Sequence, residues 1–390
     1  MANLETLHER ANNALIDGNN ELAIKIYNEI IESSPEDTIA YSQLMDLYYD
    51  TDKMSYYITR ANLNIVQGHY EHAINDCKKA INLDASEVRP HLKLAKLYAV
   101  TKKNVKAIDE FLRVLELDPT DKNVYFDLIT LYGEENSKES ALNIALQAVK
   151  QFENDDNFKN IAANLYYDFN DYEKALEFAK DNFIKAKIYL QMESLEKAYE
   201  VLEDIKNSNP KKDNKINYLK LLAQYNYVKK DFNKALETLG EYVKEAKPNP
   251  VYFQMMALVY EGLKDEVNAH INWGYCAKQR DRIEEAIVQF HSAHNLDPKN
   301  KDILFEIAKL YEMNNEKFVS MDFYQKIYEI DGDKEASNIL ADFYKKQGDL
   351  RLYKKYAGIE EDENVAKEYE EAFEQDEGLL NKILNFFSKK

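Results

Sequence analysis

The residues of this chain whose spacing could support metal chemistry are two His-x-x-His pairs, His69/His72 and His291/His294. On a helix, residues three apart lie on one face, so each pair could chelate a zinc ion through two imidazoles. A zinc site takes further protein ligands, and neither pair is accompanied by a third Cys or His ligand in register. His294 also falls on the apolar side of its expected helix. We therefore expect no metal site and no bound cofactor.

The candidates for nucleophilic chemistry are the two cysteines, Cys77 and Cys276. A reactive cysteine needs a neighbouring base or cation to form its thiolate, and the sequence places none beside either residue in a recognisable pattern. Motifs for a serine nucleophile, a phosphate-binding glycine loop and a zinc protease are also missing from the sequence. We predict no catalytic residue and expect that the chain is not an enzyme.

The composition is typical of a soluble helical protein. The chain has 390 residues, of which 45% are hydrophobic, and it has only 10 Gly and 7 Pro. Its 51 basic and 70 acidic residues give a net charge of −19, which repels nucleic-acid phosphates. No apolar run reaches the roughly 18 residues of a membrane span. Two cysteines without paired spacing are typical of a reducing compartment, so we expect a cytoplasmic protein without nucleic-acid partners.

Small residues recur along the chain with a fixed period. Ala73, Ala107, Ala141 and Ala175 are each 34 residues apart, and Tyr98, Tyr132 and Tyr166 keep the same spacing of 34. A proline follows several of these segments, at Pro35, Pro119, Pro210 and Pro298. This pattern resembles the tetratricopeptide repeat family, in which each unit is a pair of helices that pack closely through small residues. The resemblance covers roughly residues 4 to 360.

The resemblance implies an all-α fold, an α-solenoid superhelix of about ten helix pairs with two extra helices and a C-terminal capping helix. The intervals from Ala23 to Ala73 and from Ala235 to Ala286 are 50 and 51 residues, which leaves room for one extra helix in each. We expect these helices at about 38–50 and 250–263. We predict one continuous array over 1–360, irregular at 38–53, 178–182, 210–215 and 249–264. An acidic capping helix at 361–377 and a short amphipathic tail at 378–390 follow it.

The resemblance also implies a non-catalytic scaffold or adaptor that binds a partner protein or an extended peptide along the first helices of its pairs. Amide side chains there could satisfy the backbone of an extended peptide. The lining carries nine cations against six anions on an acidic chain, which favours an acidic peptide. The candidate groove residues are Asn12, Asn62, Arg89, Lys96, Asn123, Phe126, Asn157, Asn160, Asn164, Lys187, Lys220, Gln224, Tyr275, Lys278 and Lys309.

Two alternatives remain open at this point. The first helices resemble those of co-chaperones that grip a C-terminal carboxylate, and the clamp positions correspond to His8, Asn12, Thr59, Arg89 and Lys93. Of these, only Asn12 matches the clamp residue type. In the second alternative, the protein is a peripheral membrane assembly factor. Its membrane contact would be made only by residues 378–390, where Leu380, Ile383, Leu384 and Phe387 share one face.

Overall fold

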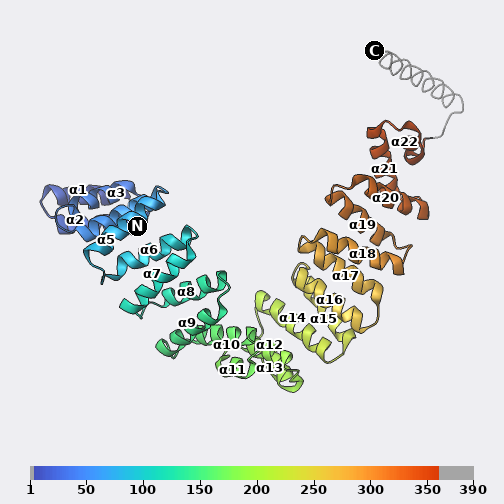
Figure 1. The fold of residues 1–390 in the computed structure, drawn as a ribbon, viewed down its shortest axis with the longest axis horizontal. Helices are drawn as coiled ribbons and strands as arrows, with labels where there is room; N and C mark the ends of the chain where they lie inside the picture. Colours follow the sequence, from blue (N-terminus) through green and yellow to red (C-terminus); the bar gives the residue numbers. More distant parts are fainter. Residues whose placement is uncertain (1–3, 360–390) are drawn as a thin grey trace, which may run out of the picture. The chain divides into compact units, whose positions relative to one another are not determined.

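The protein is described here by a computed structural model that covers residues 4–359. Over these residues the chain forms 22 α-helices and no β-strand (Figure 1). The chain divides into two compact units, residues 1–188 and 189–390. We describe the two units separately.

Unit 1 is built from helices that each pack against the next helix in sequence, from α1 to α11 (Figure 1). Helix α12 contains the boundary at Ile188. The helices are α1 (Leu4–Ile16), α2 (Asn20–Ser33), α3 (Thr38–Tyr48), α4 (Lys53–Val66), α5 (Tyr70–Leu83), α6 (Val88–Val100), α7 (Asn104–Leu117), α8 (Lys122–Glu134), α9 (Lys138–Gln151), α10 (Asp156–Asp168), α11 (Tyr172–Phe178) and α12 (Asn182–Gln191).

Unit 2 continues the same stacking from α13 to α22. Its helices are α13 (Leu195–Asn207), α14 (Lys212–Val228), α15 (Phe232–Glu245), α16 (Pro250–Gly262), α17 (Glu266–Gln279), α18 (Ile283–Leu296), α19 (Lys301–Met313), α20 (Lys317–Asp331), α21 (Lys334–Gln347) and α22 (Leu350–Ala357).

The turns inside the helix pairs share a left-handed backbone residue. In unit 1 these residues are Gly18, Gly68, Lys102, Asn136 and Asn170, with φ of 72°, 75°, 56°, 54° and 60°. After Lys102, the amide of Lys103 bonds back to Tyr98 O at 2.8 Å, which satisfies a carbonyl at the end of α6. A left-handed residue with this return bond ends a helix and reverses the chain, so the 34-residue period is also a period of the backbone.

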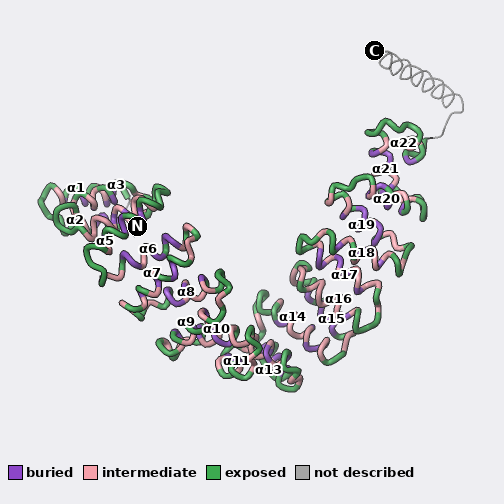
Figure 2. The backbone as a smooth tube through the Cα atoms, viewed as in Figure 1, coloured by how far each residue is buried: buried purple, intermediate pink, exposed green. Residues whose placement is uncertain are grey.

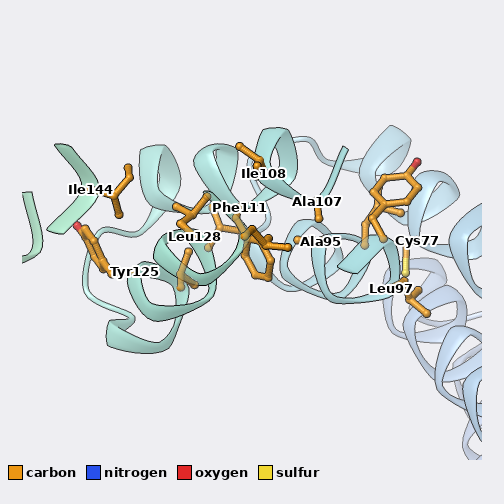
Figure 3. Close-up of a cluster of buried hydrophobic side chains, with 14 of the residues drawn as sticks. Cys77, Ala95, Leu97, Ala107, Ile108, Phe111, Tyr125, Leu128 and Ile144 are labelled. Atoms are coloured by element: carbon orange, nitrogen blue, oxygen red, sulfur yellow. The ribbon is translucent and has the colours of Figure 1, made fainter. Parts of the chain in front are cut away.

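The predicted small residues sit where neighbouring helices touch. Ala95 of α6 and Ala107 of α7 are completely buried, and Phe111 fills the space beside them. Figure 3 shows this part of the unit 1 core, which also contains Cys77 and Leu128. Figure 2 shows that the buried positions lie within the helices, whereas the turns are exposed. Every predicted small position of the pairs is buried: Ala11, Ala23, Ala61, Ala73, Ala95, Ala107, Ala141, Ala163, Ala175, Ala186, Ala198, Ala223, Ala235, Gly274, Ala286, Ala308 and Ser320.

The prediction of about ten helix pairs with two extra helices is confirmed over the described residues. The extra helices are α3 and α16, and they begin at Thr38 and Pro250. Neither is isolated, since α3 packs against α2 and α4, and α16 packs against α15 and α17. Helix α11 is short, with 7 residues. The expected capping helix at 361–377 and the tail at 378–390 lie outside the described residues.

Candidate functional site

In unit 1 the candidate groove residues lie on the first helices of the pairs, α1, α4, α6, α8, α10 and α12. Lys96, Asn123, Asn157 and Asn164 are exposed, whereas Asn62 is half-buried. The helical register gives these positions. In each first helix a small residue faces the second helix of its pair, and the residue directly after it points away from that second helix. We call this set of first-helix residues the first-helix face of unit 1.

Two lysines on α6 form the most basic point of this face. Lys96 is exposed, and Lys93 is half-buried one turn before it. Burial lowers the pKa of Lys93, and the charge of Lys96 lowers it further. Within residues 4–359, no carboxylate lies in ion-pair distance of the Lys93 ammonium. A bound anion would stabilise a half-buried cation that has no counter-ion, because folding has already removed part of the water around the cation.

An aromatic platform lies on the neighbouring first helices. The ring of Phe126 on α8 is half-buried and stacks on Phe158 of α10, with centroids 4.5 Å apart and planes at 19°. Phe158 is fully buried and stacks in turn on Phe152 at 5.5 Å. Asp127 follows Phe126, and burial raises the pKa of this carboxyl group. The first-helix face of unit 1 therefore combines free cations, one partly buried acid and a fixed apolar surface.

Three other candidate residues of unit 1 already have partners. The side-chain oxygen of Asn160 accepts hydrogen bonds from the amides of Lys180 and Asp181, at 2.8 and 3.0 Å. Asn160 thereby holds the segment that leads into α12, so it does not serve as a free peptide acceptor. The ammonium of Lys187 lies 3.8 Å from the ring centroid of Tyr167. Asn12 accepts a hydrogen bond from the hydroxyl of Tyr27 at 3.0 Å.

The first-helix face of unit 2 differs from the expected basic lining. Lys278 of α17 is bound to Glu306 of α19, with Nζ and Oε2 2.6 Å apart. Tyr275 lies between Phe253 and Phe290, both at 5.2 Å between centroids, and burial raises the Tyr275 pKa to about 12. The remaining candidates of unit 2 lie on α14 and α19. The ammonium of Lys220 lies 5.9 Å from the Tyr242 ring centroid, that of Lys309 lies 5.5 Å from the Phe305 ring centroid, and Gln224 is half-buried.

The residues at the carboxylate-clamp positions are mostly engaged elsewhere. His8 binds Asp37 at 2.8 Å, and Arg89 binds Glu87 at 2.8 Å through its Nε. Thr59 is only 7% exposed. Of the five positions, only Lys93 keeps a free charge among residues 4–359. This arrangement favours an anion site at Lys93 over a complete clamp.

The two histidine pairs and the two separate cysteines pack as structural residues do. The rings of His69 and His72 meet edge to face, 5.7 Å apart. Over residues 4–359 no group of three metal-ligating side chains comes together. Burial raises the pKa of Cys77 to about 12, which is the opposite of an activated thiolate. Cys276 is also buried, and its thiol donates to the carbonyl of Pro250 at 3.3 Å.

His291 and His294 belong to a polar cluster on α18. His291 Nε2 and the Tyr311 hydroxyl are 3.1 Å apart, and the His291 and Phe323 ring centroids are 5.4 Å apart. Burial lowers the pKa of His291, and His294 and Lys326 lower it further through their charges. Burial also lowers the pKa of His294, so the surroundings of both histidines favour their neutral forms.

Sequence reasoning missed one buried charge network. Arg60 of α4 donates to Asp76 of α5 through both Nε, at 2.9 Å, and Nη2, and Asn64 donates to the same carboxylate at 3.0 Å. Asp76 is 3% exposed. The signal was present in the repeat alignment, because Arg60 stands where the next two repeats carry Leu94 and Leu128.

The comparisons with known proteins agree with this fold. Residues 55–87, which comprise α4 from Ser55 onward, α5 and the turn after it, match the family model described as tetratricopeptide repeat. The same helix pair recurs along the chain with the same turn and the same buried small residues. The family model thus identifies a tetratricopeptide repeat at residues 55–87, and the recurrence of the same turn and small residues extends the resemblance to the other helix pairs. Proteins of this family serve in general as non-catalytic scaffolds for protein–protein interaction.

Similar solved structures are also of this type. A tetratricopeptide repeat protein from Parabacteroides merdae ATCC 43184 is 13% identical, with 79% of this chain and 98% of that chain covered and a TM-score of 0.30. MamA is 16% identical, with 51% and 97% covered and a TM-score of 0.28. The P58(IPK) tetratricopeptide repeat domain is 17% identical, with 90% and 100% covered and a TM-score of 0.27. These TM-scores are low, so the family assignment rests on the matched repeat and its recurrence. No curated protein matches the chain.

None of the helices within residues 4–359 is both long enough and apolar enough to cross a bilayer.

Proposed function

We propose that this protein is a non-catalytic adaptor that binds an extended acidic segment of a partner protein on the first-helix face of unit 1. The observation that carries the proposal is the half-buried Lys93, which has no counter-ion among residues 4–359 and lies beside the exposed Lys96. A carboxylate placed between the two ammonium groups would form charge-assisted hydrogen bonds in a partly desolvated position. The rest of the chain is strongly acidic, so it would repel the same segment elsewhere.

The flanking residues suit an extended backbone. Phe126 offers an apolar surface for one side chain of the peptide, and its stacking on Phe158 fixes its orientation. Asn123, Asn157 and Asn164 are exposed amides on the following helices, and amides can both donate to and accept from a peptide backbone. In this proposal unit 2 contributes less, because its central cation, Lys278, is neutralised by Glu306. We place the interaction in the cytoplasm, where two unpaired cysteines are expected to remain reduced.

The test uses a short, end-blocked fluorescent peptide that alternates glutamate with leucine, and its glutamine analogue. Binding to the full chain is measured by fluorescence anisotropy at low and high salt. The variant Lys93→Gln/Lys96→Gln is expected to lose about 1.5–3 kcal/mol of binding free energy, which is roughly a ten- to hundredfold loss of affinity. The matched control is Lys78→Gln, an exposed lysine on the second helix α5.

The proposal requires three results together. The glutamate peptide binds and the glutamine analogue does not, the loss is smaller at high salt because exposed charges are screened, and the control behaves like the unaltered protein. If the double variant keeps its circular dichroism and still binds the glutamate peptide with unchanged affinity at low salt, the acidic segment binds somewhere else. Equal affinity of the protein for the glutamate peptide and for its glutamine analogue would also refute recognition by charge.

A further inference from the structure

The last helix pairs of unit 2 enclose a hollow that the peptide site does not use. It has a volume of about 420 Å³ and lies between the start of α20, the end of α21 and the turn before α22. Its apolar wall is Phe318, Val319, Met321 and Phe343, and its polar rim contains Asp322, Gln347 and Asp349. The lining of the hollow therefore combines apolar side chains with two carboxylates.

Phe318 exposes a large apolar side chain at this hollow. Its side chain is 71% exposed, although it stands at the edge of the hollow against Phe343, with ring centroids 5.5 Å apart. Phe343 itself is only 8% exposed, so the two rings form a step with a buried lower part and an open upper part. An exposed aromatic ring beside a concave apolar surface is typical of an interaction site.

The rim is negative in its electrostatics. Asp322 and Asp349 both lie near the hydroxyl of Tyr344, and their charges raise the pKa of that hydroxyl in addition to the effects of burial and of Tyr356. One oxygen of Asp349 accepts the amide of Leu352 at 3.0 Å, as the N-cap of α22. A cation of the occupant would find two carboxylates at the edge of one apolar hollow.

A second hollow connects this site with the end of the described chain. It has a volume of about 750 Å³ and is lined by Asp349, Arg351, Leu352, Lys355 and Ile359. Asp349 lines both hollows, and Ile359 is the last described residue. The chain that follows Ile359 therefore starts beside the second hollow, which shares Asp349 with the first.

We propose that residues 379–387 of this same chain occupy the hollow formed by Phe318, Phe343 and Asp349. Residues 360–390 number 31, and the twenty residues from 360 to 379 span up to about 66 Å when extended, so the connection is long enough to turn back. The occupant contains Leu380, Ile383, Leu384 and Phe387 for the apolar wall.

The charges of the two C-terminal segments match the two hollows. Residues 378–390 contain three lysines, Lys382, Lys389 and Lys390, and no acidic residue, which suits the rim of Asp322 and Asp349. Residues 360–377 are rich in Asp and Glu, which suits the second hollow with its Arg351 and Lys355. With the order reversed, like charges would meet at both hollows, so the basic tail and not the acidic stretch is the occupant of the Phe318 hollow.

The start of α20 provides a direct reporter of occupancy. The first hydrogen bond there is Ser320 N to Glu316 O at 3.1 Å, and the N-cap Glu316 makes no side-chain capping bond. The amides of Lys317, Phe318 and Val319 therefore lack intrahelical acceptors and exchange quickly with solvent unless something covers them.

The experiment compares hydrogen–deuterium exchange of residues 317–319 in full-length protein without lipid. In Leu380→Ser/Leu384→Ser, these amides are expected to exchange at least roughly fivefold faster than in the unaltered protein. Asn381→Ser/Asn385→Ser changes two polar residues with the same spacing, off the apolar face, and should stay close to the unaltered protein. Asp322→Lys should also accelerate exchange, and adding Lys382→Glu to Asp322→Lys should restore protection.

The outcomes distinguish the intramolecular site from its alternatives. Equal exchange in all variants means that the tail does not cover the hollow. Protection that increases with protein concentration means that a second copy supplies the occupant. In the unaltered protein, protection of residues 317–319 that is lost when phosphatidylserine vesicles are added supports the intramolecular site, with the membrane as a competitor. The Leu380→Ser/Leu384→Ser variant must then lack this protection even without vesicles. Exchange that is fast without vesicles and unaffected by the serine substitutions assigns the tail to another surface.

Discussion

Replacing Gly274 with alanine tests the packing that defines the helix pairs. Gly274 lies on α17 where other first helices carry alanine, and it faces α18. A Cβ added at Gly274 would lie 2.6 Å from Cε2 of Phe290 and 2.8 Å from Cδ2. Phe290 is 1% exposed, and its ring meets Tyr275 edge to face at 5.2 Å. The ring therefore cannot move aside without disturbing a second aromatic residue.

The magnitude follows from two opposing effects. Alanine in place of glycine inside a helix stabilises by about 0.5–1 kcal/mol because it restricts the unfolded chain. Overpacking a filled core costs about 1–3 kcal/mol. The control Gly240→Ala is on α15, where a Cβ would meet nothing within 4 Å, so only the first effect remains. The two variants should differ by about 1–3 kcal/mol in the free energy of unfolding, with Gly240→Ala the more stable.

The assay is urea unfolding followed by circular dichroism, with hydrogen exchange to locate the effect. Because each repeat contacts only its neighbours, faster exchange should be confined to α17, α18 and the adjacent helices. Adding Phe290→Leu to Gly274→Ala should recover part of the loss, with a coupling of about 0.5–3 kcal/mol. If Gly274→Ala stabilises the protein as much as Gly240→Ala does, the claim that α17 and α18 pack closely at Gly274 is wrong.

Three further predictions follow from the turns and the buried charges. Lys102 has a φ of 56°, so Lys102→Gly should stabilise by about 0.5–1 kcal/mol, whereas Lys103→Gly, at a φ of −99°, should not; urea midpoints separate the two. Asp76→Ala leaves the Arg60 guanidinium without its carboxylate and should cost about 1–3 kcal/mol in unfolding free energy, and a loss below the error of the melt would show that the pair contributes nothing. The pKa of His291 is lowered in the fold, so the unfolded state binds its proton more tightly and stability is lost as the pH falls below about 6.5. His291→Gln should remove that part of the acid sensitivity, and an unchanged pH profile of the urea midpoint would contradict it.

Much of the fold could be predicted because repeat packing is local. The spacing of Ala73 and Ala107 fixes which helix faces meet, and an interval that is longer by about one helix can only hold one, as α3 and α16 show. The left-handed turn residues could also have been found, because Gly68 and Asn136 are residue types that tolerate a positive φ.

The candidate site was harder to predict because pairing between side chains of different repeats is not periodic. Lys278 is neutralised by Glu306 of the next repeat, and Asn160 caps a segment twenty residues further on. Neither partner can be identified from helix register, which gives the face of a residue but not the rotamer of its neighbour. Lys93 was recognised only as a clamp position, whereas its importance comes from its partial burial without a counter-ion among residues 4–359.

The most direct test of the peptide-binding account is to locate the bound peptide by photo-crosslinking. The glutamate–leucine peptide, with a photoreactive leucine analogue at its centre, is irradiated with the full chain, and the adducts are mapped by mass spectrometry. The account predicts adducts on α6 and α8, around Lys96 and Phe126, that disappear in Lys93→Gln/Lys96→Gln and persist in Lys78→Gln. Adducts that fall instead on the second helices, or on unit 2 around Tyr275, would contradict it.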